Sequence, residues 1–121
     1  MGKILVVDDE ELIRDILRQI LQQDGHEVIE AGDGDTAIKT ARDVRPDLIV
    51  LDMVMPKMTG LEIAPVLRSH PGTKNIPIIA LTGSRSPETT EDIHNAGCDR
   101  YIAKPINAEQ ILGAVAKLLN K

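Results

Sequence analysis

The sequence has almost no aromatic residues: Tyr101 stands alone, and tryptophan and phenylalanine are absent. The hydrophobic core must therefore be built from isoleucine, leucine, valine, alanine and methionine. Cysteine is equally scarce, since Cys98 is the only one, and this excludes an internal disulfide framework. A single thiol fits a reducing compartment, so we expect a cytoplasmic protein.

An excess of positive charge and long apolar runs are also missing. Fourteen basic side chains against nineteen acidic ones give a formal net charge of -5, which argues against direct binding to nucleic acid or to an anionic membrane. The longest apolar runs have the length of a strand, well short of the ~20 residues that span a bilayer, so membrane insertion is not expected. A chain of 121 residues can bury one real core, and we expect a single domain over residues 1–121.

Four short apolar runs each lead directly into polar side chains. The runs cover residues 4–7, 48–51, 78–81 and 101–103, and the polar residues that follow them are Asp8 with Asp9, Asp52, Thr82 and Lys104. Near-continuous apolar runs of this length are typical of parallel strands that are covered on both faces. Residues 26–31 are expected to form one further short strand.

Segments with helical spacing separate these strands. We expect helices over about residues 12–24, 33–44, 59–69, 88–96 and 108–119, and the first would bury one face made of Leu12, Ile13, Ile16, Leu17, Ile20 and Leu21. Thr59 and Glu62 have the spacing of a capping box. Pro65 removes a backbone donor early in that helix, so we expect a kink or a later start. Five strand–helix pairs predict a parallel α/β sheet with helices on both faces, a three-layer sandwich.

The polar residues at the strand ends should form one site, because ligands of open α/β sheets bind outside the carboxyl ends of the strands. Clustered carboxylates repel one another by about 4 kcal/mol at 4 Å for an effective dielectric near 20, so Asp8, Asp9 and Asp52 need a cation or a proton. Oxygen ligands without His or Cys favour Mg²⁺, which also takes oxygens from a phosphate. Asp52 is then the best candidate nucleophile toward phosphorus, with Thr82 and Lys104 donating to the phosphoryl oxygens.

Each of these residues also has an ordinary structural interpretation. An Asp after a strand is often the N-cap of the next helix, and Asp52 precedes a loop with turn residues. Thr82 before Gly83 and Lys104 before Pro105 are individually unremarkable. Taken together, however, four strand ends that supply complementary groups to one crevice are not explained by turn and cap chemistry.

At their spacings, these residues resemble the receiver domain of two-component response regulators, the CheY-like family. The resemblance covers essentially the whole chain. Its motifs are Val-Val-Asp-Asp-Glu at 6–10, Leu-Ile-Val-Leu-Asp-Met-Val-Met-Pro-Lys-Met-Thr-Gly at 48–60, Ala-Leu-Thr-Gly at 80–83 and Ala-Gly-Cys-Asp-Arg-Tyr-Ile-Ala-Lys-Pro at 96–105. The resemblance implies a flavodoxin-like (βα)5 fold with the strand order 2-1-3-4-5.

The resemblance also implies how the site works. Asp52 would accept a phosphoryl group from a phosphohistidine of a sensor histidine kinase or a histidine phosphotransfer protein. Asp9, Asp52 and the backbone carbonyl of Val54 would bind Mg²⁺, for which Mn²⁺ is a possible substitute, and Asp8 would act mostly through water. The protein would catalyse only its own phosphoryl transfer and dephosphorylation.

Further roles follow from the same resemblance. Thr82 and Tyr101 would form the switch, with the aromatic ring rotating inward as the threonine moves toward the phosphate. The bond between Lys104 and Pro105 would be cis. Val54 and Ser84 flank the reaction site without a carboxylate or amide to orient water, so we expect slow self-dephosphorylation.

The expected output is a change of surface around the fourth helix, the fifth strand and the fifth helix, read by a downstream protein. The sequence ends with the fifth helix, so output by protein contact is the simplest interpretation, although a receiver excised from a longer regulator would look identical. The protein would be a monomer or a phosphorylation-dependent dimer.

The main alternative is a constitutive interaction domain that keeps the fold without phosphorylation. A phosphatase would commonly place an acid where Val54 stands, and a nucleotide or flavin site would need a Gly-rich or Ser/Thr-rich loop at residues 8–11.

Overall fold

A single five-stranded sheet organises the chain in the computed structural model, which describes residues 2–83 and 89–120. All strand pairs are parallel, and the strand order is β2-β1-β3-β4-β5. The strands are β1 (Lys3–Val7), β2 (Glu27–Ala31), β3 (Leu48–Asp52), β4 (Ile78–Thr82) and β5 (Arg100–Ala103). Both the parallel sheet and the order 2-1-3-4-5 are thus confirmed.

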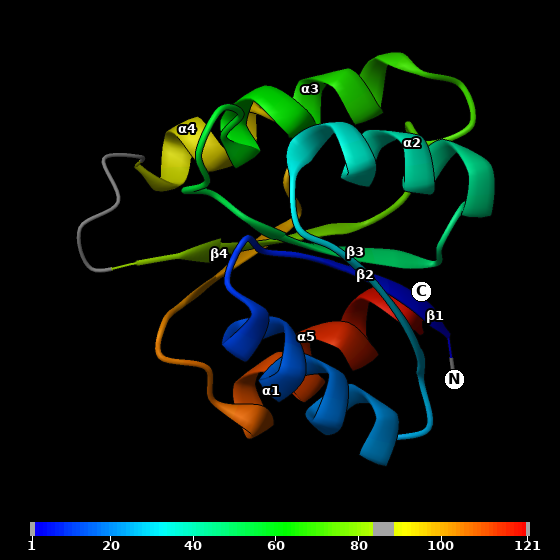
Figure 1. Cartoon of the computed structure of the whole chain (residues 1–121), viewed down its shortest axis with the longest axis vertical. Helices are drawn as coiled ribbons and strands as arrows, with labels where there is room; N and C mark the ends of the chain where they lie inside the picture. Colours follow the sequence, from blue (N-terminus) through cyan, green and yellow to red (C-terminus); the bar gives the residue numbers. More distant parts are fainter. Residues whose placement is uncertain (1, 84–88, 121) are drawn as a thin grey trace.

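Helices cover both faces of the sheet. They are α1 (Glu11–Gln23), α2 (Gly34–Val44), α3 (Gly60–Ser69), α4 (Thr90–Asn95) and α5 (Ala108–Leu119). Figure 1 shows α2, α3 and α4 on one face and α1 and α5 on the other, so the molecule has three layers. Among the residues that the structure describes, none of these helices is both long enough and apolar enough to cross a bilayer.

The strands alternate their side chains between two aliphatic cores. Leu5, Ile49 and Ala80 belong to the core beneath α2, α3 and α4, whereas Ile4, Val50 and Ile79 belong to the core beneath α1 and α5. The buried side chains of both cores are aliphatic, methionine and Cys98 only. Tyr101, the sole aromatic residue, stands outside them with 52% of its surface exposed.

The buried face of α1 is narrower than its apolar stripe predicts. Leu17 and Leu21 are buried, but Leu12 and Ile16 are 69% and 36% exposed, so their predicted burial is wrong. At about 100° per residue, the six apolar positions spread over about half of the helix circumference. The sheet and α5 cover only the part around Leu17, and Leu12 and Ile16 therefore form an exposed apolar pair.

The other helices differ from the predicted ranges only at their ends. α4 begins at Thr90, because the Thr89 hydroxyl accepts from the Asp92 N–H (3.1 Å) and the Asp92 carboxylate accepts from the Thr89 N–H (3.0 Å). The predicted start at Glu88 lies outside the described residues. α3 begins at Gly60 with the predicted capping box, so Pro65 lies inside it and a later start is excluded.

Candidate functional site

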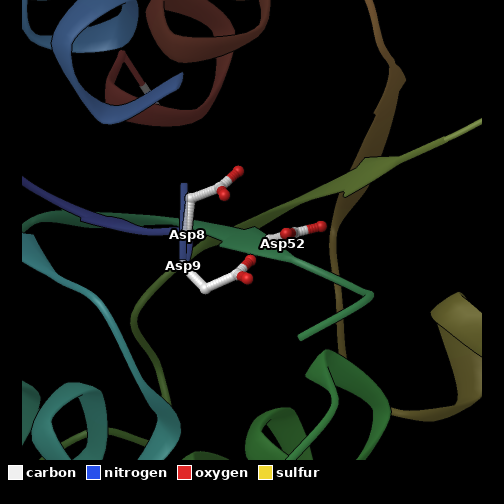
Figure 2. A group of neighbouring side chains, drawn as sticks. All are labelled: Asp8, Asp9 and Asp52. Atoms are coloured by element: carbon white, nitrogen blue, oxygen red, sulfur yellow. The ribbon is translucent and has the colours of Figure 1, made fainter. Parts of the chain in front are cut away.

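The site lies at the carboxyl edge of the sheet. Asp8 and Asp9 follow β1, and Asp52 is the last residue of the neighbouring β3. Figure 2 shows the three carboxylates turned toward the same side, and each can offer an oxygen within 4.8 Å of the others. The strand ends therefore bring the acids together as the sequence predicts, because parallel strands in register end at one edge.

Two of the three acids are withdrawn from solvent. Asp8 is 0% exposed and Asp52 is 2% exposed, whereas Asp9 faces the solvent. Asp8 Oδ1 accepts a hydrogen bond from the Glu10 N–H (2.9 Å), but Asp8 Oδ2 is buried and accepts no hydrogen bond from the part of the chain that the structure describes. A buried carboxylate oxygen that accepts no hydrogen bond is costly, and the positive charge of the Lys104 ammonium, 3.2 Å away, offsets this cost only in part.

One ammonium group faces these carboxylates. Lys104 Nζ lies 3.2 Å from Asp8 Oδ2 and 3.4 Å from Asp52 Oδ2, and it is 3.9 Å from Glu10 Oε1. The peptide bond from Lys104 to Pro105 is cis, as predicted. Among the described residues, four carboxylates gather around this ammonium group, and the excess of negative charge favours a further cation.

Burial and charge together set the pKa values in the site. Burial, followed by repulsion from Asp8, raises the pKa of Asp52 to about 6, although the Val54 N–H (3.2 Å) and Lys104 act in the opposite direction. Burial also lowers the pKa of Lys104, but the charges of Asp52 and Asp8 outweigh it and leave that pKa raised. The surroundings of the Asp52 carboxylate therefore favour either a bound proton or a nearby positive charge.

The remaining predicted residues are Thr82, Val54, Tyr101 and Ser84. Thr82 ends β4 opposite Ala103, and its carbonyl accepts from the Lys104 N–H (2.7 Å), which fastens the β5 end to β4. Val54 follows Asp52 with half of its surface exposed. Tyr101 lies on the outer surface of β5, and Ser84 lies outside the described residues.

Two supporting residues were not predicted. Glu10 adds a fourth carboxylate beside Lys104, and the run of acids at residues 8–11 was the signal for it. Gly60 packs against the acceptor strand: its N–H donates to the Met53 carbonyl (3.2 Å), and a Cβ there would lie 2.7 Å from the Asp52 carbonyl oxygen. Glycine therefore leaves the room that this approach needs.

A doubly wound parallel sheet with a buried acid cluster and a lysine at its carboxyl edge is typical of an α/β protein whose ligand site lies at the ends of the strands. The chain belongs to the response regulator receiver domain family, whose model matches residues 4–116. It is therefore a receiver domain of the kind used in two-component signalling. The flavodoxin-like, CheY-like fold is confirmed by the same comparison and by the strand order.

Relatives of known role include both short and long proteins. The polar-differentiation response regulator DivK of Brucella anthropi is 33% identical over 116 residues, which are 96% of this chain and 94% of DivK. The CAI-1 autoinducer sensor kinase/phosphatase CqsS of Vibrio cholerae is 39% identical over 115 residues, which are 94% of this chain but 17% of CqsS. The chain thus matches nearly all of one relative and a small part of the other.

Solved structures give the same picture. The chemotaxis protein CheY4 of Vibrio cholerae has a TM-score of 0.91 and 37% identity, with 98% of this chain and 99% of CheY4 covered. The receiver domain of the sensor histidine kinase PA1611 from Pseudomonas aeruginosa has a TM-score of 0.91 and 26% identity, with 99% and 98% covered. In that structure a magnesium ion is coordinated in the active site cleft.

Proposed function

We propose that Asp52 accepts a phosphoryl group from a phosphohistidine in a reaction that requires Mg²⁺, and that the modified protein signals through a changed surface. The observation that carries this proposal is the buried pair of Asp8 and Asp52, whose Oδ2 atoms both face Lys104. Family membership implies a histidine kinase or a phosphotransfer protein as the phosphoryl source. The phosphoryl donor, the phosphorylation and the signal that follows it all belong to this proposal.

The residues present fit a magnesium ion. The site offers hard carboxylate oxygens without His or Cys, and Asp8 Oδ2 is buried without a hydrogen bond from the described residues. Asp9, Asp52 and the Val54 carbonyl would hold the ion directly, with Asp8 bonded mostly through water, and Mn²⁺ could substitute. Bound there, the ion would neutralise the carboxylates and the charge of the phosphoryl group.

The chain's own groups account for the transfer. An oxygen of the Asp52 carboxylate attacks phosphorus, the phosphorus–nitrogen bond of the donor breaks, and its electron pair stays on the imidazole. Lys104 Nζ, already 3.4 Å from Asp52 Oδ2, donates to a phosphoryl oxygen as negative charge develops. The hydroxyl of Thr82 would donate to another. Water would later cleave the acyl phosphate, so the protein catalyses only its own phosphorylation and dephosphorylation.

Different surfaces would serve the donor and the downstream partner. The donor must approach the mouth of the site, and Leu12 and Ile16 are exposed in the first two turns of α1, the helix that directly follows the acids in the chain. For the output, β5 and α5 border an open groove of about 430 Å³ that includes Tyr101. A smaller cavity of about 160 Å³ lies between Tyr101 and α4, and it would receive the ring when Thr82 moves toward the phosphate. The α4-β5-α5 face is accordingly the proposed output face, used as a monomer or in a phosphorylation-dependent dimer.

Intact mass spectrometry of the whole chain tests the proposal. We expect acetyl phosphate to add one phosphoryl group in the presence of Mg²⁺ and none after chelation, with the group on Asp52. The added mass should persist for minutes after the donor is removed, because Val54 does not orient water; loss within seconds would contradict slow self-dephosphorylation. A folded protein that gains no phosphoryl group would favour the alternative, a constitutive interaction domain of the same fold.

Lys104 and Mg²⁺ compete for the same carboxylates. Lys104→Met is therefore expected to tighten Mg²⁺ binding by about 5-fold, because the ammonium that now faces Asp8 and Asp52 is removed. Calorimetric titration with MgCl₂ measures the change. Lys117→Met removes the same charge from the exposed surface of α5 and should leave the affinity unchanged; equal affinities of the two variants would contradict the competition.

A further inference from the structure

Arg14 reaches from α1 to the backbone of the acid cluster. Its Nη1 donates to the carbonyl oxygen of Asp8 at 2.7 Å, and its Nε donates to Glu30 Oε1 on β2 at 3.2 Å. The side chain is only 19% exposed, so these bonds are shielded from water. None of the catalytic roles above uses this residue.

The hydrogen bond from Arg14 to the Asp8 carbonyl lies just beyond the last hydrogen bond between β1 and β2. The Asp8 N–H donates to the Ala31 carbonyl (3.2 Å), which is the last rung between β1 and β2. Beyond Ala31 the chain leaves the sheet and Asp33 becomes the N-cap of α2, so β2 has no further residue to donate to the Asp8 carbonyl. The guanidinium takes the place of that missing backbone donor.

The hydrogen bond that orients the Asp8 carbonyl also orients the start of Asp9. The carbonyl of Asp8 and the N–H of Asp9 belong to one planar peptide unit, so a bond that orients the first orients the second. The Asp9 side chain starts from this peptide unit, and its carboxylate lies on the same side as those of Asp8 and Asp52 (Figure 2). Because Asp9 is the exposed member of the three acids, its direction depends on the backbone beneath it.

Arg14 is itself held in place. Glu30 accepts from Arg14 through Oε1 and from Arg18 Nη1 through Oε2 (3.0 Å), and Arg18 also pairs with Asp15 (2.9 Å). Gly32 leaves room for the guanidinium, because a Cβ there would come within 3.2 Å of Arg14 Nη1. The fork geometry of arginine suits a residue that must bond a carboxylate and a carbonyl at once.

We propose that Arg14, anchored by Glu30, is a positioning residue for the metal site: it orients the Asp8–Asp9 peptide so that the Asp9 carboxylate faces the ion. This inference rests on the proposed function, because it concerns the same Mg²⁺ site. The proposed role of Arg14 is opposite to the effect that its positive charge alone would have on Mg²⁺ binding. Loss of a nearby positive charge should strengthen Mg²⁺ binding, whereas loss of the orientation should weaken it.

Arg18→Ala is the matched control for Arg14→Ala. Both variants remove one arginine of α1 that pairs with Glu30, but only Arg14 bonds the Asp8 carbonyl. We expect Arg14→Ala to weaken Mg²⁺ binding about 10-fold, in line with the loss of outer-shell partners at metal sites, and Arg18→Ala to change it less than about 2-fold. Arg14→Lys keeps the charge but cannot bond both partners, so its loss should be intermediate, about 3-fold.

The measurement is calorimetric titration of the whole chain with MgCl₂, together with the thermal midpoint without metal. A purely structural role would lower the midpoint of both alanine variants and leave the affinities equal, which would overturn the inference. If Arg14→Ala does not fold, the comparison of Arg14→Lys with Arg18→Ala decides in the same way. A wild-type chain that binds no Mg²⁺ would overturn the proposed function itself, an outcome distinct from wild-type binding that Arg14 does not affect.

Discussion

Asp52→Asn is expected to abolish Mg²⁺-dependent phosphorylation and, in the absence of metal, to make the protein more stable. Phosphorylation is lost because an amide oxygen is a poor nucleophile and a weak ligand for Mg²⁺. Stability rises because the carboxylate is buried away from water and is also repelled by Asp8, which together raise its pKa to about 6. Asparagine removes that charge and can still accept from the Val54 N–H. The proposed function of Asp52 thus requires a carboxylate that, without metal, lowers the stability of the folded chain.

The pH dependence has a definite sign. The pKa of Asp52 rises from an ordinary 3.8 to about 6 on folding, so between these values the folded chain holds the proton more tightly than the unfolded chain does. The free energy of unfolding therefore falls as pH rises through this window, and stays low above pH 6. After allowance for solvent screening, we expect a loss of about 1–2 kcal/mol that the asparagine variant does not show.

Urea unfolding followed by circular dichroism, with chelator present, measures this difference. At pH 7 the variant should exceed the wild type by about 1–2 kcal/mol, and at pH 4 the two should be nearly equal. Asp35→Asn is the control, because Asp35 is exposed in the first turn of α2 and its removal should gain nothing. A wild type that is more stable than Asp52→Asn at pH 7 without metal would show that Asp52 is not held in a repulsive site.

Features that depend on neighbouring residues in the sequence could be predicted, whereas features that depend on tertiary contacts could not. The strand ends were predictable, because buried parallel strands are continuous apolar runs and the first polar residue after each run marks the edge. Asp8, Asp52 and Lys104 were found in this way. The strand order came from the family resemblance, since periodicity does not say which strands are neighbours.

The misses have a common cause in tertiary packing. The apolar stripe of α1 was visible in the sequence, but the width of the surface that covers it was not, and Leu12 and Ile16 were wrongly predicted to be buried. The contact of Arg14 with the Asp8 carbonyl depends on where β2 stops relative to β1. Gly60 could be read as a turn residue, and only the structure shows which atoms lie against it.

Gly60→Ala is expected to lower the free energy of unfolding by about 2–3 kcal/mol and to impair Mg²⁺ binding. A Cβ at this position would lie 2.7 Å from the Asp52 carbonyl oxygen and 2.9 Å from Met53 Cα. These are backbone atoms, which cannot rotate away as a side chain can, so the loop after β3 must shift. Because the end of β3 carries Asp52 and the loop carries the Val54 backbone, the distortion reaches the proposed metal ligands directly.

Gly113→Ala provides the opposite result from the same chemical change. Gly113 lies inside α5, and apart from the backbone of α5 itself, no described residue lies within 4 Å of the Cβ that alanine would add. Alanine should therefore raise the free energy of unfolding by about 0.5–1 kcal/mol, because glycine is unfavourable in a helix interior. Urea unfolding of both variants, with MgCl₂ titration of each, separates two effects. One is the conformational freedom of the glycine backbone, and the other is the space left by its missing side chain. If Gly60→Ala were as stable as Gly113→Ala, the close approach of α3 to the acceptor strand would not be what requires glycine. If Gly60→Ala were destabilised but bound Mg²⁺ normally, the loop shift would not extend to the carboxylates.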